Sequence, residues 1–198
     1  LRLAQDAYLL LGQSAAMRDS VARVWPEWRD DDPLTSFVLG ARAFGLEETG
    51  DYAAAEAAAR EALARNPADA WAAHALAHVF EMTARPREGA AFLEASRADW
   101  GQAHFMAGHN GWHLALFLIE LGRIEEVLAG FDRYMLAALA NDATLDRVDA
   151  ASLLWRLELE GVDVGARLNA VRKQGAAHVH DHVLAFNDLD LALAFGGE

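Results

Sequence analysis

Apolar and polar residues follow one another along this chain with the period of an α-helix. From the first residues onward, apolar positions recur three and four residues apart, as at Leu1, Ala4, Tyr8 and Leu11. Alanine, which has the highest helix propensity, is abundant, whereas prolines number only four and β-branched residues are sparse. The pattern predicts an all-α protein with helix over most of its length.

A turn signature recurs along the chain at nearly constant spacing. It is clearest at residues 50–52 (Gly-Asp-Tyr), where an alanine-rich helical pattern follows and ends at Pro67. Similar turns begin at Gly12, Ala84, Gly122 and Gly161, so the intervals run from 34 to 39 residues. A regular period of this length is typical of stacked helical hairpins, none of which can bury its apolar face alone.

We therefore predict one helical-repeat domain over residues 1–198, folded as an α-α superhelical solenoid. The expected hairpins cover approximately residues 1–25, 34–67, 70–98, 106–140, 144–173 and 182–195. The chain starts with Leu1, inside a helical pattern and with no N-cap residue ahead of it. We accordingly expect it to be a fragment of a longer protein.

Composition and charge narrow the range of functions. A hydrophobic content of 54% excludes intrinsic disorder, and the lack of cysteine excludes disulfides, thiolate metal sites and a cysteine nucleophile. The net charge of −13 argues against nucleic acid and anionic membrane surfaces as partners. No uncharged apolar run reaches the ~20 residues of a membrane helix, and no signal-peptide pattern is present. These features predict a cytoplasmic protein.

The spacing and the turn composition resemble tetratricopeptide repeats. The best-matching unit places small, aromatic and proline residues as that repeat does, with Ala43, Gly50, Tyr52, Ala55, Ala62 and Pro67. More narrowly, the chain resembles the tetratricopeptide repeat protein 38 family, through residues 17–24, 43–48, 69–82, 109–116 and 148–157. The resemblance implies the repeat fold and a longer N-terminus, but no defined chemistry. Two positions depart from the family pattern: Gly111 replaces a bulky aromatic residue, and Asp190 stands where we expect histidine.

Two histidine pairs are the strongest chemical signal. His74 and His78 are four residues apart with Glu81 three further on, and His109 and His113 repeat the four-residue spacing. Residues at this spacing share one face of a helix. Both pairs fall on first helices of hairpins, which line the concave face in repeats of this type. Trp112, one residue before His113, is a further candidate for the same groove. The neighbouring first helices add Phe44, Glu47, Glu48 and Trp155.

The histidine pairs have three interpretations that the sequence leaves open. Helices pack 8–10 Å apart, so imidazoles of His74, His78, His109 and His113 could share one divalent ion, with Zn, Fe, Mn or Ni as suitable metals. Against a metal, neither a His-Glu-x-x-His motif nor a Glu-x-x-His pair is present. The second interpretation is a polar pocket without a metal, and the third is that the histidines serve only in packing. Both involve the same four residues.

Three further histidines, His178, His180 and His182, alternate just before an apolar helical pattern that starts near Val183. We expect Asp181 to cap that helix by accepting hydrogen bonds from its first backbone N–H groups. A second metal site at these histidines is the alternative.

The sequence supports three kinds of function. The first is a binding module that holds a peptide, protein or small molecule in a concave groove rich in His, Trp and Glu. Because the groove and the chain are acidic, a cationic, aromatic or neutral ligand fits better than a carboxylate tail. The second is a metal-dependent oxidoreductase or hydrolase that uses the paired histidines. The third is a plain scaffold. The oligomeric state is not indicated.

Overall fold

The computed structural model describes residues 1–196, apart from the side chains of residues 104 and 105. Residues 197 and 198, the end of the predicted domain, lie outside the described part. Within the described part all regular secondary structure is helical, which confirms the all-α prediction. No helix found there is both long enough and apolar enough to cross a membrane.

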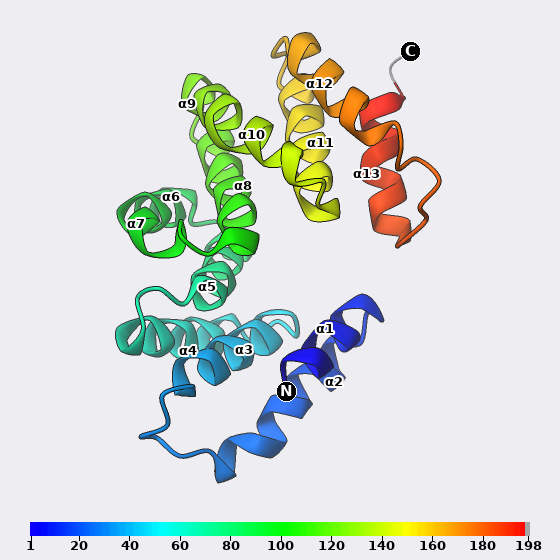
Figure 1. The fold of residues 1–198 in the computed structure, drawn as a ribbon. Helices are drawn as coiled ribbons and strands as arrows, with labels where there is room; N and C mark the ends of the chain where they lie inside the picture. The colour runs from blue at the N-terminus through cyan, green and yellow to red at the C-terminus, as the bar shows by residue number, and fades with distance from the viewer. Residues whose placement is uncertain (197–198) are drawn as a thin grey trace. The chain divides into compact units, whose positions relative to one another are not determined.

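Most helices follow one another after short turns, and longer loops precede α3 and α13 (Figure 1). The longer α-helices are α1 (Arg2–Leu10), α2 (Ser14–Val24), α3 (Thr35–Glu47), α4 (Tyr52–Arg65), α5 (Ala70–Met82), α6 (Pro86–Ala95), α8 (His104–Glu120), α9 (Ile124–Gly130), α11 (Thr144–Leu159), α12 (Gly165–Gly175) and α13 (Ala185–Phe195). Shorter segments are the 3-10 turn η1 (Trp25–Glu27), α7 (Arg97–Trp100), the π-helical η2 (Phe131–Met135), α10 (Leu136–Ala138) and the 3-10 turn η3 (Leu139–Asn141).

Five turns that join successive helices share one backbone conformation. Gly12, Gly50, Ala84, Gly122 and Gly161, the residues at which the sequence signature begins, all have positive φ angles between 54° and 84°. In each turn the following N–H donates to a carbonyl five residues back, for example from Asp51 to Leu46 (2.9 Å). This is the Schellman arrangement, which satisfies the last carbonyls of a helix and favours glycine.

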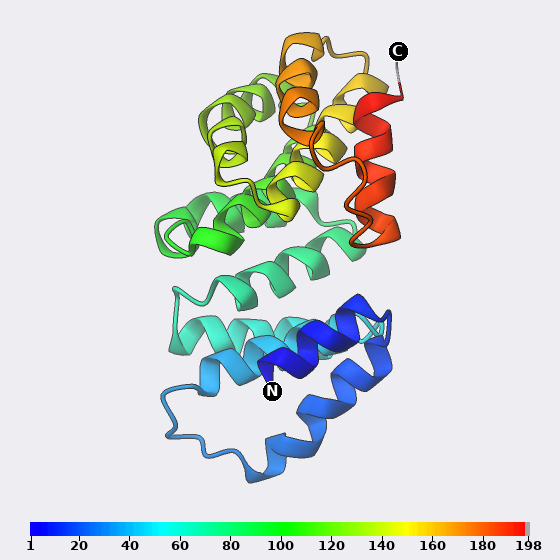
Figure 2. The same ribbon diagram turned by 45° about the vertical axis from the view of Figure 1, so that its right-hand side comes forward.

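The helices form two compact units. The first covers Leu1–Asn110 and the second starts at Gly111, so the boundary falls inside α8. In the first unit α3 packs along both α4 and α5, and α2 packs on α3 (Figure 2). Its core contains the fully buried Leu39, Ala62 and Ala72, with Trp25 and Leu63 packed against them. Small alanine side chains let these helices approach closely.

The second unit is organised around α11, which packs against α12 and α13. Leu153, Leu154 and Leu157 of α11 are fully buried, as are Phe131 of η2 and Val171 of α12. The last expected segment, 182–195, contains one helix, α13.

Candidate metal centre

Helix α5 carries the first two histidines of the site. Its first turn is fixed by Asp69, whose carboxylate accepts hydrogen bonds from the backbone N–H groups of Trp71 and Ala72. One turn further on, His74 is buried with 4% of its surface exposed, and His78 is half-buried. Their Nε2 atoms lie 2.9 Å apart. The four-residue spacing therefore places both rings on one face, as predicted.

Helix α8 brings the third histidine to the same place. The rings of His74 and His109 lie 4.9 Å apart between centroids. The next residue, Asn110, is fully buried and donates a hydrogen bond from Nδ2 to the carbonyl of Ala70 (3.1 Å). One ligand atom from each of His74, His78 and His109 falls within 4.8 Å of the others. Three imidazoles from two helices thus converge in the first unit.

Helix α3 forms the wall behind the two α5 histidines. The ring of Phe44 lies 5.2 Å from that of His74 and 5.5 Å from that of His78, edge-on to the latter. Three residues later on α3, Oε2 of Glu47 lies 3.4 Å from Nδ1 of His78. Phe44 and Glu47, both expected from the sequence, therefore belong to this histidine cluster.

Two neighbouring carboxylates stand beside His78. Glu47 is only 5% exposed, and within the described residues its Oε2 accepts no hydrogen bond. Glu48 accepts a hydrogen bond from Ser14 Oγ (3.3 Å). Burial, and then the negative charge of Glu47, raises the pKa of Glu48. One ligand atom each of Glu47, Glu48 and His78 falls within 4.8 Å of the others, so this end of the cluster is rich in negative charge.

The fourth predicted histidine, His113, lies one helical turn after His109 on α8 and is 2% exposed. It belongs to the second unit, where its ring lies 5.0 Å from that of Trp112. Trp112 donates from Nε1 to Ser152 Oγ (3.0 Å), and the Arg156 guanidinium lies 5.5 Å from its ring. The same guanidinium lies 5.9 Å from the ring of Trp155. The two tryptophans thus belong to a polar cluster of the second unit.

Other residues of the predicted groove are placed differently. Glu81, expected on the histidine face, is exposed in the last turn of α5 and is not part of the grouped ligand atoms. The guanidinium of Arg2 lies 3.4 Å above the ring of Trp71.

Two residues beside the histidine cluster, Arg2 and Asn110, were not predicted from the sequence. The only signal for Asn110 was a polar residue inside an apolar helical run.

The histidines near the C-terminus do not form the predicted cap or metal site. Helix α13 starts at Ala185 with no side-chain cap, and Asp181 instead pairs with Nδ1 of His178 (2.6 Å). His178 also contacts Asp142 (3.0 Å), and His182 contacts Asp188 (3.0 Å). Separate carboxylates thus hold the two rings, and within the described residues these histidines do not gather as grouped ligands.

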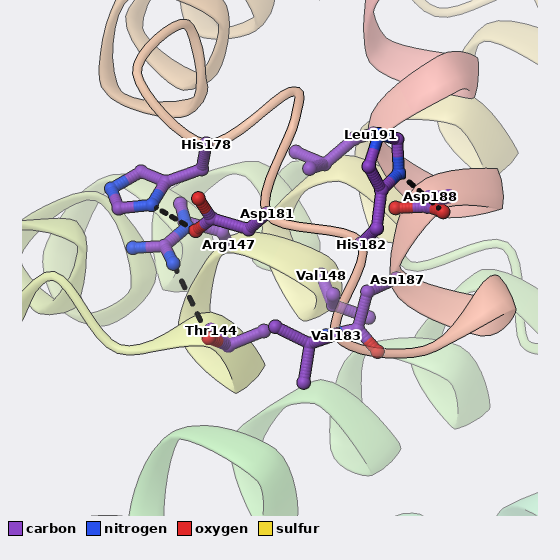
Figure 3. A pocket seen from close by; sticks show the side chains of 10 residues that line it. All are labelled: Thr144, Arg147, Val148, His178, Asp181, His182, Val183, Asn187, Asp188 and Leu191. Carbon is purple, nitrogen blue, oxygen red and sulfur yellow. Dashed lines mark hydrogen bonds and ion pairs between the residues drawn. The ribbon is translucent and has the colours of Figure 1, made fainter.

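These side chains line a hollow in the second unit (Figure 3). Buried Arg147 of α11 is one of the lining residues and donates hydrogen bonds to Asp142 and Thr144. The hollow is therefore a place where histidine, arginine and aspartate side chains tie the loop before α13 to α11, and its charged groups are largely paired.

Comparison with known proteins does not identify a family for this chain. No family model matches the chain, and no solved structure matches it.

Proposed function

We propose that this protein binds one divalent metal ion at the histidine cluster formed by His74, His78 and His109. The observation that carries the proposal is the convergence of three imidazoles from α5 and α8, with ligand atoms within 4.8 Å of one another. Imidazole nitrogens bind such an ion about 2.0–2.1 Å away, so ligand atoms at this separation need only small rotamer changes.

The ligand chemistry indicates which metal. Neutral imidazoles suit Zn, Fe or Ni better than Mg or Ca, which prefer oxygen ligands. The site is buried on the side of His74, whereas His78 is half-buried and gives access from solvent. The nearby negative charge of Glu47 and Glu48 favours a cation over any anionic ligand.

A peptide or small ligand in a concave groove remains the second candidate function. Half-buried His78 and the partly exposed aromatic rings around the cluster support it. The metal proposal is favoured because the aromatic side chains are already used within the chain: Phe44 packs on two imidazoles and Arg2 covers Trp71. The metal-dependent hydrolase or oxidoreductase expected as an alternative would act through this same centre.

The protein fold that carries this centre is, we infer, a solenoid of tetratricopeptide type, akin to the tetratricopeptide repeat protein 38 family. The support is the nearly constant spacing of the five left-handed turns and their common hydrogen-bond pattern. Each turn joins two helices, as the repeat requires.

Metal analysis of the purified chain tests the proposed function. After incubation with Zn²⁺ and removal of excess ion, we expect one equivalent of zinc per chain. His74→Ala and His109→Ala should each abolish stoichiometric binding, while circular dichroism reports that the variants fold. His180→Ala, a histidine outside the cluster, is the matched control and should retain the full equivalent. A wild-type chain without bound zinc, or equal loss in the control, would overturn the proposal.

A further inference from the structure

Glu47 and His78 are in contact at one side of the histidine cluster. The two groups lie on different helices, α3 and α5, and Oε2 of Glu47 is 3.4 Å from Nδ1 of His78. The other ring nitrogen of His78, Nε2, faces His74 at 2.9 Å. The imidazole of His78 therefore contacts the Glu47 carboxylate through Nδ1 and faces the other histidines of the cluster through Nε2.

This arrangement decides which nitrogen of His78 carries its proton. A carboxylate beside Nδ1 favours a proton on that atom, because a bare lone pair there would face negative charge. In the neutral ring, Nε2 is then left with the lone pair that a metal requires. Metal-bound histidines commonly donate their second N–H to a carboxylate in this way, which fixes the ring and increases its basicity.

The burial of Glu47 agrees with a role in fixing the ring of His78. Its carboxylate is almost completely buried, and within the described residues no donor satisfies Oε2. A buried carboxylate oxygen without a hydrogen bond costs the fold free energy, so stability alone does not account for it. Its neighbour Glu48 differs, since that carboxylate accepts from Ser14 on another helix.

Resting on the proposed metal site, we propose that Glu47 is the positioning residue of this centre. When the ion binds, Oε2 of Glu47, which lies 3.4 Å from Nδ1 of His78 and among the described residues accepts no hydrogen bond before, accepts a hydrogen bond from the Nδ1–H group and so aims Nε2 at the ion. Phe44, packed against the rings of His74 and His78, restricts their rotation from the same helix. Helix α3 therefore supplies no ligand but holds the ligands of α5 in the binding orientation.

The experiment compares Glu47→Gln with Glu48→Gln in the whole chain. Each variant removes one negative charge beside His78, but only the first removes the carboxylate that contacts Nδ1. Zn²⁺ affinity is measured by competition with a chromophoric chelator, and Co²⁺ absorption reports the ligand set. We expect Glu47→Gln to weaken zinc binding about 10- to 100-fold, with one equivalent still bound at saturation and the Co²⁺ spectrum of histidine ligation retained. Glu48→Gln should change the affinity less than about threefold.

The unfolding midpoint of the metal-free chain separates positioning from a merely structural role. We expect it to be unchanged or raised in Glu47→Gln, because the buried Oε2 that accepts no hydrogen bond in the described part of the chain is then part of a neutral amide. A lowered midpoint, or equal weakening in both variants, would show a structural or a general charge effect and overturn the inference. Two zinc equivalents in the wild type, with one lost in Glu47→Gln, would instead make Glu47 a ligand and also overturn it. If the wild type binds no zinc, the proposed function itself fails, which is a distinct result.

Discussion

The side-chain amide of Asn110 donates a hydrogen bond to the backbone carbonyl of Ala70, at 3.1 Å. This contact joins α8 to the first turn of α5, one residue after His109 and four residues before His74. It fixes the position of one histidine-bearing helix along the other within the first unit.

Replacement of Asn110 should therefore damage both stability and the metal centre. Asn110→Ala leaves the buried Ala70 carbonyl without this donor, and we expect a loss of about 1–3 kcal/mol in the free energy of unfolding. Zinc affinity should fall as well, because His109 loses its fixed position. Chemical denaturation and zinc competition measure the two effects. Gln102→Ala, which removes an exposed amide that donates to Ala98, is the control and should change neither.

The N-cap of α5 offers a second test. Asp69 is fully buried and accepts from two backbone N–H groups at the start of the helix that carries His74 and His78. Asp69→Ala should lower the free energy of unfolding by about 1–2 kcal/mol. Burial raises the pKa of Asp69, so its charge is poorly solvated. Asp69→Asn keeps a capping oxygen without that charge and should cost clearly less. Equal losses in the two variants would contradict the capping role.

A pH-dependent contribution is expected from Glu56 on α4, which accepts hydrogen bonds from Arg85 (2.6 Å) and Arg60 (2.7 Å). These guanidinium groups, Arg85 first, lower the pKa of Glu56 below its usual range. A depressed carboxyl pKa stabilises the fold above the unfolded-state pKa of about 4.3, and the effect is lost at lower pH. Glu56→Gln should therefore cost about 1 kcal/mol at pH 7 and progressively less as the pH falls below about 4. A difference independent of pH in urea denaturation would exclude this ion pair as its cause.

Asp190 in α13 should have the opposite effect. Its side chain is buried with one oxygen lacking a hydrogen-bond partner within the described residues, and burial raises its pKa to about 6. Arg156 lowers this pKa and Asp149 raises it. Because the folded-state pKa exceeds the unfolded value, ionisation of Asp190 destabilises the fold as the pH rises from about 4 to 6.

Asp190→Asn should consequently be more stable than the wild type at pH 7, by about 1 kcal/mol after allowance for solvent screening. The two proteins should unfold at the same denaturant concentration near pH 4, where the wild-type carboxyl is protonated. A variant that is less stable at pH 7 would show that the charge of Asp190 is needed for its attraction to Arg156.

The sequence by itself determined the local structure, because local structure depends on neighbours in the chain. Helical periodicity predicted the helices, and the turn signatures marked Gly50 and its counterparts, where a left-handed residue closes each helix end. The same periodicity put His74 and His78 on one face, since residues four apart in a helix always lie together.

The contacts between residues that are far apart in the sequence depend on tertiary packing. Glu81 shares the predicted stripe with His78, yet it is exposed in the last turn of α5. Asp181 is a good capping residue by type, but the loop before α13 brings it to His178 instead. The contacts of Glu47 with His78 and of Asn110 with Ala70 depend on how α3, α5 and α8 pack, which is set by the summed burial of many small side chains. No single spacing in the sequence records that sum.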